Sequence, residues 1–299
     1  KMRTLYGIGA DWPLSYSDLE HYYLRAEREL GVSGGPGANV PPRSAPYPLP
    51  AHPYSYANEE LFGPAFEKLG LSMSPVTLAI NSQAYGGRPA CAAFGTCAPM
   101  CPIGTKYTAL THIEQTEATG QVHVKANSHV RRIRLSAPRT VGYIEYVTGA
   151  GDREYQEARA FVLAAGGIEN ARLLLLSAGQ GPHADGLANS SGLVGRGFMA
   201  HNAALVLGHH PMRTGGHRIG FHSSQTWALY THTTLPKTGN VLIKMGAAGP
   251  TPALVAATAG TWGEALKKHV VETYGHTLYL TIAGEVLPNP ENRVRLSTG

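Results

Sequence analysis

The segment that most constrains the fold covers residues 161–179, FVLAAGGIENARLLLLSAG. Its first seven residues form a continuous apolar run that suits a buried parallel strand. The stretch that follows the two glycines predicts a helix that ends at Gly179. Before this segment, VHVKANSHVRRIRL and VGYIEYVTG alternate like half-buried strands. Residues 121–179 therefore predict strands that lead into a strand–glycine–helix corner, as in dinucleotide-binding α/β folds.

The residues before this region predict helices joined by irregular connections. Ser17 and Glu20 form a capping box ahead of a helix that Gly31 stops. Residues 36–53 hold seven prolines, which favours an extended, polyproline-like connection. A second helix is predicted in NEELFGPAFEKLG, capped by Asn58 and closed by Gly70, and a third in TKYTALTHIEQTEATG.

From about residue 203 the pattern changes to short strands. ALVLGHH, TWALYTHT, NVLIKMG and TLYLTIAGEVL are strand-like, and GEALKKHVVETYG predicts one helix. This mixture indicates an antiparallel α+β region. We therefore expect three segments: residues 1–120 with connecting helices and a cysteine loop, residues 121–202 with the dinucleotide-type corner, and residues 203–299 with an incomplete sheet.

Composition excludes several classes of protein. The net charge of +5 is small and scattered, so nucleic-acid binding has little support. No run approaches the roughly eighteen apolar residues of a membrane span, because Glu169, Asn170 and Arg172 interrupt the best candidate. The opening KMRTLYGIGADWP lacks the apolar stretch of a signal peptide. We expect no anchor within this chain.

All three cysteines, Cys91, Cys97 and Cys101, lie in CAAFGTCAPMCPIG. Pairs so close in sequence would make strained disulfides, so a disulfide framework is excluded. Closely spaced cysteines on a turn-rich loop, with a proline after the last one, are typical of iron–sulfur ligands. Three ligands suit a three-iron cluster better than a four-iron one. Zinc with His112 or His123 as fourth ligand, or three inert buried thiols, remain alternatives.

Several motifs, in order along the chain, resemble the glucose–methanol–choline (GMC) oxidoreductase family. They are GIGADWPLSYSDLEHYYLRAERELGVSG, LAAGGIENARLLLLSAG, LVGRGFMAH and LPNPENRVRLS. The cysteine segment GGRPACAAFGTCAPMCPIGTKY resembles the cluster-bearing branch, the flavoprotein subunits of bacterial glucose, fructose, sorbitol and gluconate dehydrogenases. The resemblance extends over nearly the whole chain, from residue 5 to residue 297.

The resemblance implies an α/β fold: part of an FAD-binding Rossmann-like domain within residues 121–202, plus an antiparallel-sheet substrate domain. It implies FAD near Val130, Ala165 and Gly166, and a 3Fe–4S cluster on the three cysteines. It also implies oxidation of a sugar, polyol or aldonate, with electrons passing to a cytochrome c subunit. A small chaperone-like subunit and a periplasmic location, attached to the inner membrane through a partner, follow from the same branch.

The sequence also departs from the family pattern. Residues 169–171 replace the usual Gly-Ser-Pro, and Asn202 stands where proline usually follows the histidine. The early Gly7-Ile8-Gly9 precedes Asp-Trp-Pro rather than a helix, so it is not the glycine-rich flavin loop. The family's C-terminal histidine pair is also missing. We therefore expect an internal segment of a longer protein and assign no catalytic residue.

Two further readings of function stay open at this level. One is a family member that oxidises another alcohol and uses another electron acceptor. The other is an iron–sulfur electron-transfer module without its own substrate chemistry. Four aromatic residues of the C-terminal region could stack on a sugar face, although core packing is the commoner role of such residues: Trp227, Tyr230, Trp262 and Tyr279.

Overall fold

The structure is a computed structural model that describes residues 2–37, 42–95, 97, 100–179, 181–214, 223–230, 240–246 and 252–297. The chain divides into two compact units. The first unit combines residues 11–111 with residues 201–286. The second combines residues 2–10, 112–200 and 287–299. The three-segment division expected from the sequence stays a prediction, but the cysteine loop and the C-terminal sheet share one unit.

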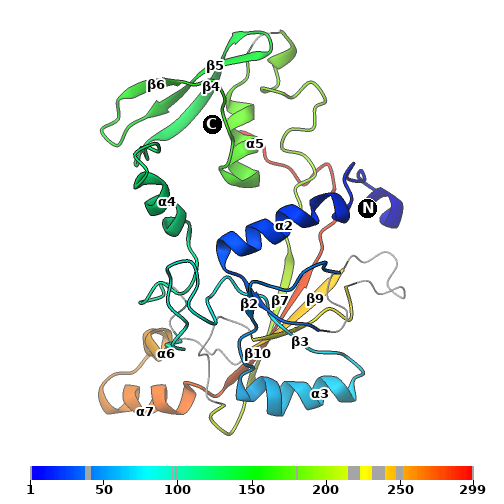
Figure 1. Ribbon diagram of the computed structural model, residues 1–299, viewed down its shortest axis with the longest axis vertical. Coiled ribbons are helices and arrows are strands. Elements are labelled where there is room, and N and C mark those ends of the chain that lie inside the picture. Colours follow the sequence, from blue (N-terminus) through cyan, green and yellow to red (C-terminus); the bar gives the residue numbers. More distant parts are fainter. Residues whose placement is uncertain are drawn as a thin grey trace. The chain divides into compact units, whose positions relative to one another are not determined.

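The first unit begins with the long helix α2, Tyr16–Leu30 (Figure 1). Its capping box uses Ser15 and Asp18, so the predicted pair was wrong by two residues. The Ser15 hydroxyl accepts the Asp18 N–H, and the Asp18 carboxylate accepts the Ser15 N–H. Gly31 ends the helix in the left-handed conformation, as predicted (φ 67°).

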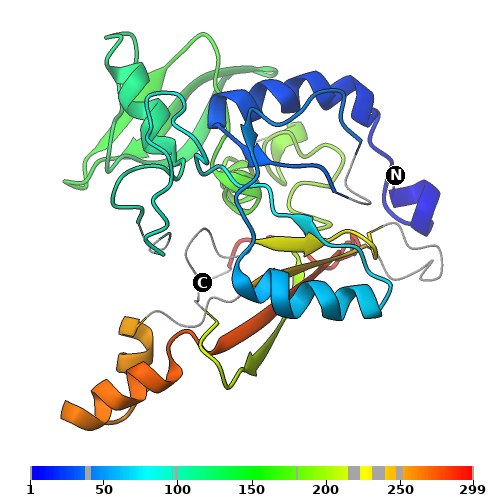
Figure 2. The ribbon, with the colours of Figure 1, turned by 60° about the horizontal axis from the view of Figure 1, so that its bottom comes forward.

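The second predicted helix forms as a π-helical turn, η1 (Ala57–Phe62), continued by α3 (Gly63–Lys68). Asn58 is fully buried inside the turn rather than capping it. Its backbone N–H donates to the Ser55 hydroxyl oxygen at 3.3 Å, and Tyr56, at the N-cap position, makes no side-chain capping hydrogen bond. The turn η1 packs against strand β9 of the sheet described next (Figure 2).

A five-stranded antiparallel sheet forms the centre of the first unit, in the order β3-β8-β9-β10-β7. The predicted strands at ALVLGHH, NVLIKMG and TLYLTIAGEVL are confirmed. The strand predicted at TWALYTHT does not form at residues 227–230, and the part of that segment after residue 230 lies outside the residues that the structure describes. The strands are β3 Ser74–Pro75, β7 Asn202–His209, β8 Ser224–Thr226, β9 Val241–Gly246 and β10 Thr277–Gly284.

Smaller elements complete this unit. Strands β1 (Ser33–Gly34) and β2 (Leu49–Pro50) form a short parallel pair after α2. Helix α7 (Gly263–Thr273) confirms the predicted C-terminal helix, and α6 (Pro252–Thr258), which the sequence pattern did not predict, packs against it. None of the described helices is both long and apolar enough to span a bilayer.

The second unit contains the antiparallel sheet β4 (His129–Ala137), β5 (Thr140–Val147) and β6 (Arg153–Glu157). Helix α5 (Gly166–Leu176) packs against β4. Three buried side chains, Ile133, Leu173 and Leu187, form the core between them. Helices α1 (Met2–Tyr6) and α4 (Ala109–Glu117) and the 3-10 turn η2 (Gly181–His183) complete the elements.

The apolar run before α5 differs from its prediction. Residues 161–164 are not in a strand, and the Val162 side chain is 87% exposed. A buried parallel strand needs neighbouring strands to accept its backbone hydrogen bonds and helices to cover its faces. No strand of the described chain pairs with this run, so its alanines and aliphatic side chains remain at the surface.

Two of the family-like motifs meet within the second unit. The Val294 N–H donates to the Gly195 carbonyl oxygen at 2.8 Å, and the Phe198 N–H donates to the Asn292 carbonyl oxygen at 2.8 Å. A Cβ at Gly195 would lie 2.6 Å from the Val294 carbonyl oxygen, and its φ is +81°. Glycine is therefore the residue that this close backbone approach permits.

Candidate functional site

The segments on either side of the cysteine loop, residues 91–104, are hydrogen-bonded to each other. Ile80 and Lys106 form an antiparallel bridge at the foot of the loop. The Asn81 N–H donates to the Thr105 carbonyl oxygen at 3.2 Å, and the Tyr107 N–H donates to the Ala79 carbonyl oxygen at 2.8 Å. The chain thus leaves and re-enters the first unit at one point.

The three cysteines lie on this single loop, and all three are free thiols. Cys97 is buried, whereas Cys91 and Cys101 are half-buried. Among the residues that the structure describes, no three cysteine, histidine or acidic side chains gather as a metal-binding group. The structure therefore brings the predicted ligands onto one loop without drawing the three sulfur atoms together.

Cys101 has the most polar surroundings. Its Sγ lies 3.1 Å from the Thr105 hydroxyl oxygen. Burial raises the pKa of the Cys101 thiol, but hydrogen bonds from the Thr105 hydroxyl and from the backbone N–H groups of Lys106, Ile103 and Thr105 outweigh it and lower the pKa to about 7. These donors favour a thiolate, the form in which cysteine binds metals. In donor chemistry, the loop suits an iron–sulfur cluster.

The hydrogen bonds around Cys101 predict that its reactivity depends on pH, which can be measured in protein without a bound cluster. Alkylation of Cys101 should be half-maximal near pH 7, because only the thiolate reacts. Replacing Thr105 by valine removes one donor to the sulfur, so the midpoint should move to higher pH. Peptide mass spectrometry of iodoacetamide-treated protein across a pH series measures this midpoint at Cys101 alone.

Thr108→Val serves as the matched control, since Thr108 is exposed and three residues away. Its alkylation midpoint should equal that of the wild type. An unchanged midpoint in Thr105→Val would contradict the assigned role of the hydroxyl.

The second predicted site is the corner between residues 161–164 and α5. Ala165 precedes the helix, and Gly166 begins it with a φ of +85°. A Cβ at Gly166 or Gly167 would meet no atom within 4 Å, so both glycines border open space. No side chain caps the first turn of α5, which leaves its N–H groups available to a polar ligand. This corner fits the approach of an FAD phosphate or ribose.

Asn170 is a residue of this corner whose role the sequence did not reveal. Its side-chain oxygen accepts the Ala165 N–H at 2.9 Å, and its side-chain nitrogen donates to the Leu163 carbonyl oxygen at 3.2 Å. The amide therefore fixes the bend between the apolar run and α5. The sequence feature that could have indicated this role is the replacement of the family's usual Gly-Ser-Pro by Glu-Asn-Ala at residues 169–171. Glu169 itself pairs with Arg172 at 2.7 Å.

Val130 lies on β4, against the buried cluster formed by Ile133, Leu173 and Leu187. Its side chain therefore has a packing role. In the β4-β5-β6 sheet, β4 is an edge strand, so one edge of its backbone has no partner strand among the described residues. This edge is compatible with the adenine contact through the backbone that the family resemblance implies. Helix α5 packs on the same strand, which brings Val130 and the corner into one unit.

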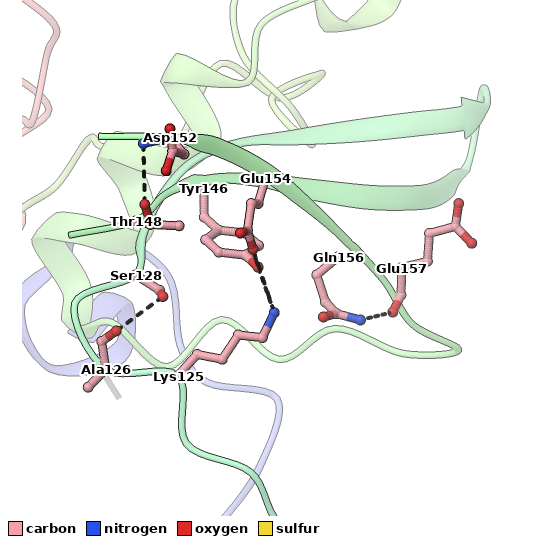
Figure 3. A network of polar contacts seen from close by, with 9 residues as sticks. All are labelled: Lys125, Ala126, Ser128, Tyr146, Thr148, Asp152, Glu154, Gln156 and Glu157. Atoms are coloured by element: carbon pink, nitrogen blue, oxygen red, sulfur yellow. Dashed lines mark hydrogen bonds and ion pairs between the residues drawn. The ribbon is translucent and has the colours of Figure 1, made fainter. Parts of the chain in front are cut away.

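A polar network lies beside the strand that carries Val130 and joins the segment before β4 to β5 and β6 (Figure 3). Lys125 Nζ donates to the Tyr146 hydroxyl oxygen at 2.6 Å, and the Tyr146 hydroxyl donates to the Glu154 carboxylate. The hydrogen bond to Tyr146 raises the pKa of Lys125, so the ammonium stays charged. Tyr146 on β5 is also the register partner of Val130, so the network reaches the strand that pairs with β4.

The aromatic candidates do not form one surface. Trp227 and Tyr230 make an edge-to-face pair with ring centroids 5.0 Å apart. Tyr279 is buried in β10, and burial raises its pKa, whereas Trp262 is 86% exposed at the start of α7. The structure therefore supports a core role for Tyr279.

Comparison with known proteins supports the family resemblance. The family model of the GMC oxidoreductases matches residues 11–203 of this chain. The chain is 32% identical to the fructose dehydrogenase large subunit of Gluconobacter japonicus, over 99% of this chain and 55% of that protein. It is 30% identical to 2-methyl-1,2-propanediol dehydrogenase of Mycolicibacterium austroafricanum, over 96% of this chain and 53% of that protein.

The gluconate 2-dehydrogenase flavoprotein of Pantoea cypripedii is 28% identical over 66% of this chain and 35% of its own length. The chain thus spans about half, or less, of the length of the curated relatives it matches. The family pattern, however, covers most of this chain, and the fructose dehydrogenase subunit aligns along nearly all of it. The chain therefore belongs to the GMC oxidoreductase family.

Proposed function

We propose that the protein containing this chain is an FAD-dependent dehydrogenase. It oxidises a hydroxyl group of a sugar, polyol or aldonate and passes the electrons through a 3Fe–4S cluster to a cytochrome c subunit. The observation that carries the proposal is that three free thiols lie on one loop whose two ends are hydrogen-bonded to each other. The chain that contains this loop is similar, over 99% of its own length, to the fructose dehydrogenase large subunit.

When bound, FAD supplies the hydride acceptor and the cluster supplies a one-electron carrier. Oxidation of a CH–OH group to a carbonyl releases one hydride and one proton, so a base must take the proton. No residue of this chain is assigned as that base. The residues of the second unit contribute to flavin binding: Gly166 and Gly167 leave room for the ligand, and Asn170 fixes the corner.

In the first unit, the cysteine loop has the role of holding the electron carrier. Cys91, Cys97 and Cys101 provide the ligands, and the hydrogen bonds to Cys101 stabilise its thiolate. A reduced flavin holds two electrons, whereas a haem accepts one at a time. A one-electron centre between the two therefore makes the transfer possible in single steps. The cytochrome partner, the small chaperone-like subunit and a periplasmic location, attached through a partner, belong to the same proposal.

A second candidate is a GMC alcohol dehydrogenase with another substrate and another acceptor. The similarity to 2-methyl-1,2-propanediol dehydrogenase, over 96% of the chain, favours this alternative because a short diol differs from a sugar in size and ring shape. The two candidates share the flavin corner. They differ in the substrate and in the need for the cysteine loop.

Anaerobic purification of the full-length protein tests the proposal. We expect flavin absorption bands, a broad iron–sulfur shoulder, about three iron atoms per FAD, and bleaching of the flavin by a sugar, polyol or aldonate. Bleaching by short diols alone, without iron, would support the second candidate. Iron without flavin would indicate an electron-transfer module, and zinc in a colourless protein would show that the cysteines hold a structural metal.

A further inference from the structure

The base of the cysteine loop contains a polar cluster, two of whose members, Asn81 and Arg88, have no part in the flavin and ligand assignments. Asn81 and Thr105 are almost completely buried, at 0% and 1% exposure. They face each other across the point where the loop closes, and Arg88 and Lys106 join them there. We refer to these four residues, Asn81, Arg88, Thr105 and Lys106, as the loop base.

The Asn81 side chain holds a tight hairpin in place. Tyr85 and Arg88 exchange two backbone hydrogen bonds of 3.0 Å around Gly86-Gly87. Both glycines have positive φ, +56° and +75°, as a two-residue type I′ turn requires. The Asn81 amide nitrogen donates to the Tyr85 and Arg88 carbonyl oxygens, both at 2.9 Å. One buried amide group thus satisfies both carbonyls.

Arg88 connects this hairpin to the other end of the loop. One guanidinium nitrogen donates to the Thr105 carbonyl oxygen at 3.0 Å, and another donates to the Leu30 carbonyl oxygen at 2.6 Å. Leu30 is the last residue of α2, whose final carbonyls have no partner inside the helix. Arg88 therefore fastens the loop base to the end of a long helix, where a cation is also electrostatically favoured.

Each cysteine is attached to the loop base by a different hydrogen bond. The Cys91 N–H donates to the Asn81 carbonyl oxygen at 2.8 Å. Lys106 Nζ donates to the Cys97 carbonyl oxygen at 2.7 Å. Cys101 Sγ contacts the Thr105 hydroxyl, with the two atoms 3.1 Å apart. Each of the three proposed ligands thus contacts one residue of the loop base.

We propose that Asn81 and Arg88 are positioning residues that preorganise the cysteine loop for an iron–sulfur cluster. The inference rests on the proposed function. Residues that orient metal ligands through hydrogen bonds affect metal retention strongly, and their loss typically weakens binding by about 10–100-fold. Asn81→Ala should release the hairpin. Arg88→Lys should break the link to Thr105 or Leu30, because an ammonium lacks the planar fork that reaches both carbonyls.

The test compares the full-length wild type, Asn81→Ala, Arg88→Lys and the matched control Asn58→Ala. Asn58 is another fully buried asparagine of the same unit, and its side chain bonds to Ser55 and Ser224, away from the loop. Iron retention is measured by metal analysis after a chelator challenge. Thermal unfolding by circular dichroism and FAD content are followed in parallel.

We expect Asn81→Ala and Arg88→Lys to retain iron about tenfold less well than the wild type, with normal FAD content. Asn58→Ala should keep its iron even where its unfolding temperature falls as far as that of Asn81→Ala. Wild-type iron retention in both loop-base variants would overturn this inference alone. Equal iron loss in Asn58→Ala would also overturn it, because stability would then explain the effect. An iron-free wild type would overturn the proposed function together with this inference.

Discussion

Replacing Cys97 by serine in the full-length protein is expected to abolish substrate-dependent reduction of cytochrome c, while substrate-dependent reduction of the flavin continues. Cys97 is the buried member of the three proposed ligands, and a serine hydroxyl is a poor substitute for a thiolate at iron. The flavin corner lies in the other compact unit and contains no cysteine. Stopped-flow absorption at flavin and haem wavelengths measures the two steps separately.

Ala92→Ser is the matched control, because it places the same hydroxyl in the same loop at an exposed position and removes no sulfur. Its cytochrome reduction should equal that of the wild type. If Cys97→Ser still reduces cytochrome at the wild-type rate, the cysteine loop has no role as an electron relay.

Replacing Gly166 by asparagine should strongly reduce the FAD content of the full-length protein. A Cβ at this position meets no protein atom within 4 Å, so a larger side chain would extend into the space proposed for the ligand. Asparagine is chosen because it tolerates positive φ better than other residues with a side chain. The measurement is the ratio of flavin to protein absorbance after gel filtration.

The control is Gly151→Asn in the connection between β5 and β6. Gly151 also has positive φ, +94°, and open space around the position of a Cβ. Both variants carry a similar backbone cost, on the order of 1 kcal/mol, but only Gly166 borders the proposed flavin site. Full FAD occupancy in Gly166→Asn would show that the cofactor does not approach this corner.

Local sequence signals predicted elements whose formation depends mainly on neighbouring residues. The helix that Gly31 ends, the helix after the Gly166-Gly167 pair, and three strands of the C-terminal sheet all appear in the structure. Periodicity and the left-handed stop at Gly31 depend on residues close in sequence. The stop predicted at Gly179 was wrong, because α5 ends at Leu176 with Ser177 as its C-cap. The capping box at Ser15 was misplaced because several serines and acidic residues stand close together there.

The run FVLAAGG shows where such reasoning fails. Apolar character predicts burial only if other strands and helices cover the segment, and those partners are set by long-range contacts. In the described chain the run is exposed and unpaired, despite a composition that favours a buried strand. Similarly, the pairing of Gly195 with Val294 joins motifs about a hundred positions apart, which periodicity cannot reveal.

The sequence by itself determined the family, the cysteine loop and the residue types that could bind iron or approach a flavin, because these depend on side-chain chemistry and on short spacings. Only the tertiary structure showed that Asn81, Arg88 and Thr105 close the cysteine loop, and that Asn170 fixes the corner before α5. Those contacts join backbone groups to buried side chains. Their geometry arises only once the chain has folded and excluded water, because a buried amide or guanidinium must then find partners within the protein.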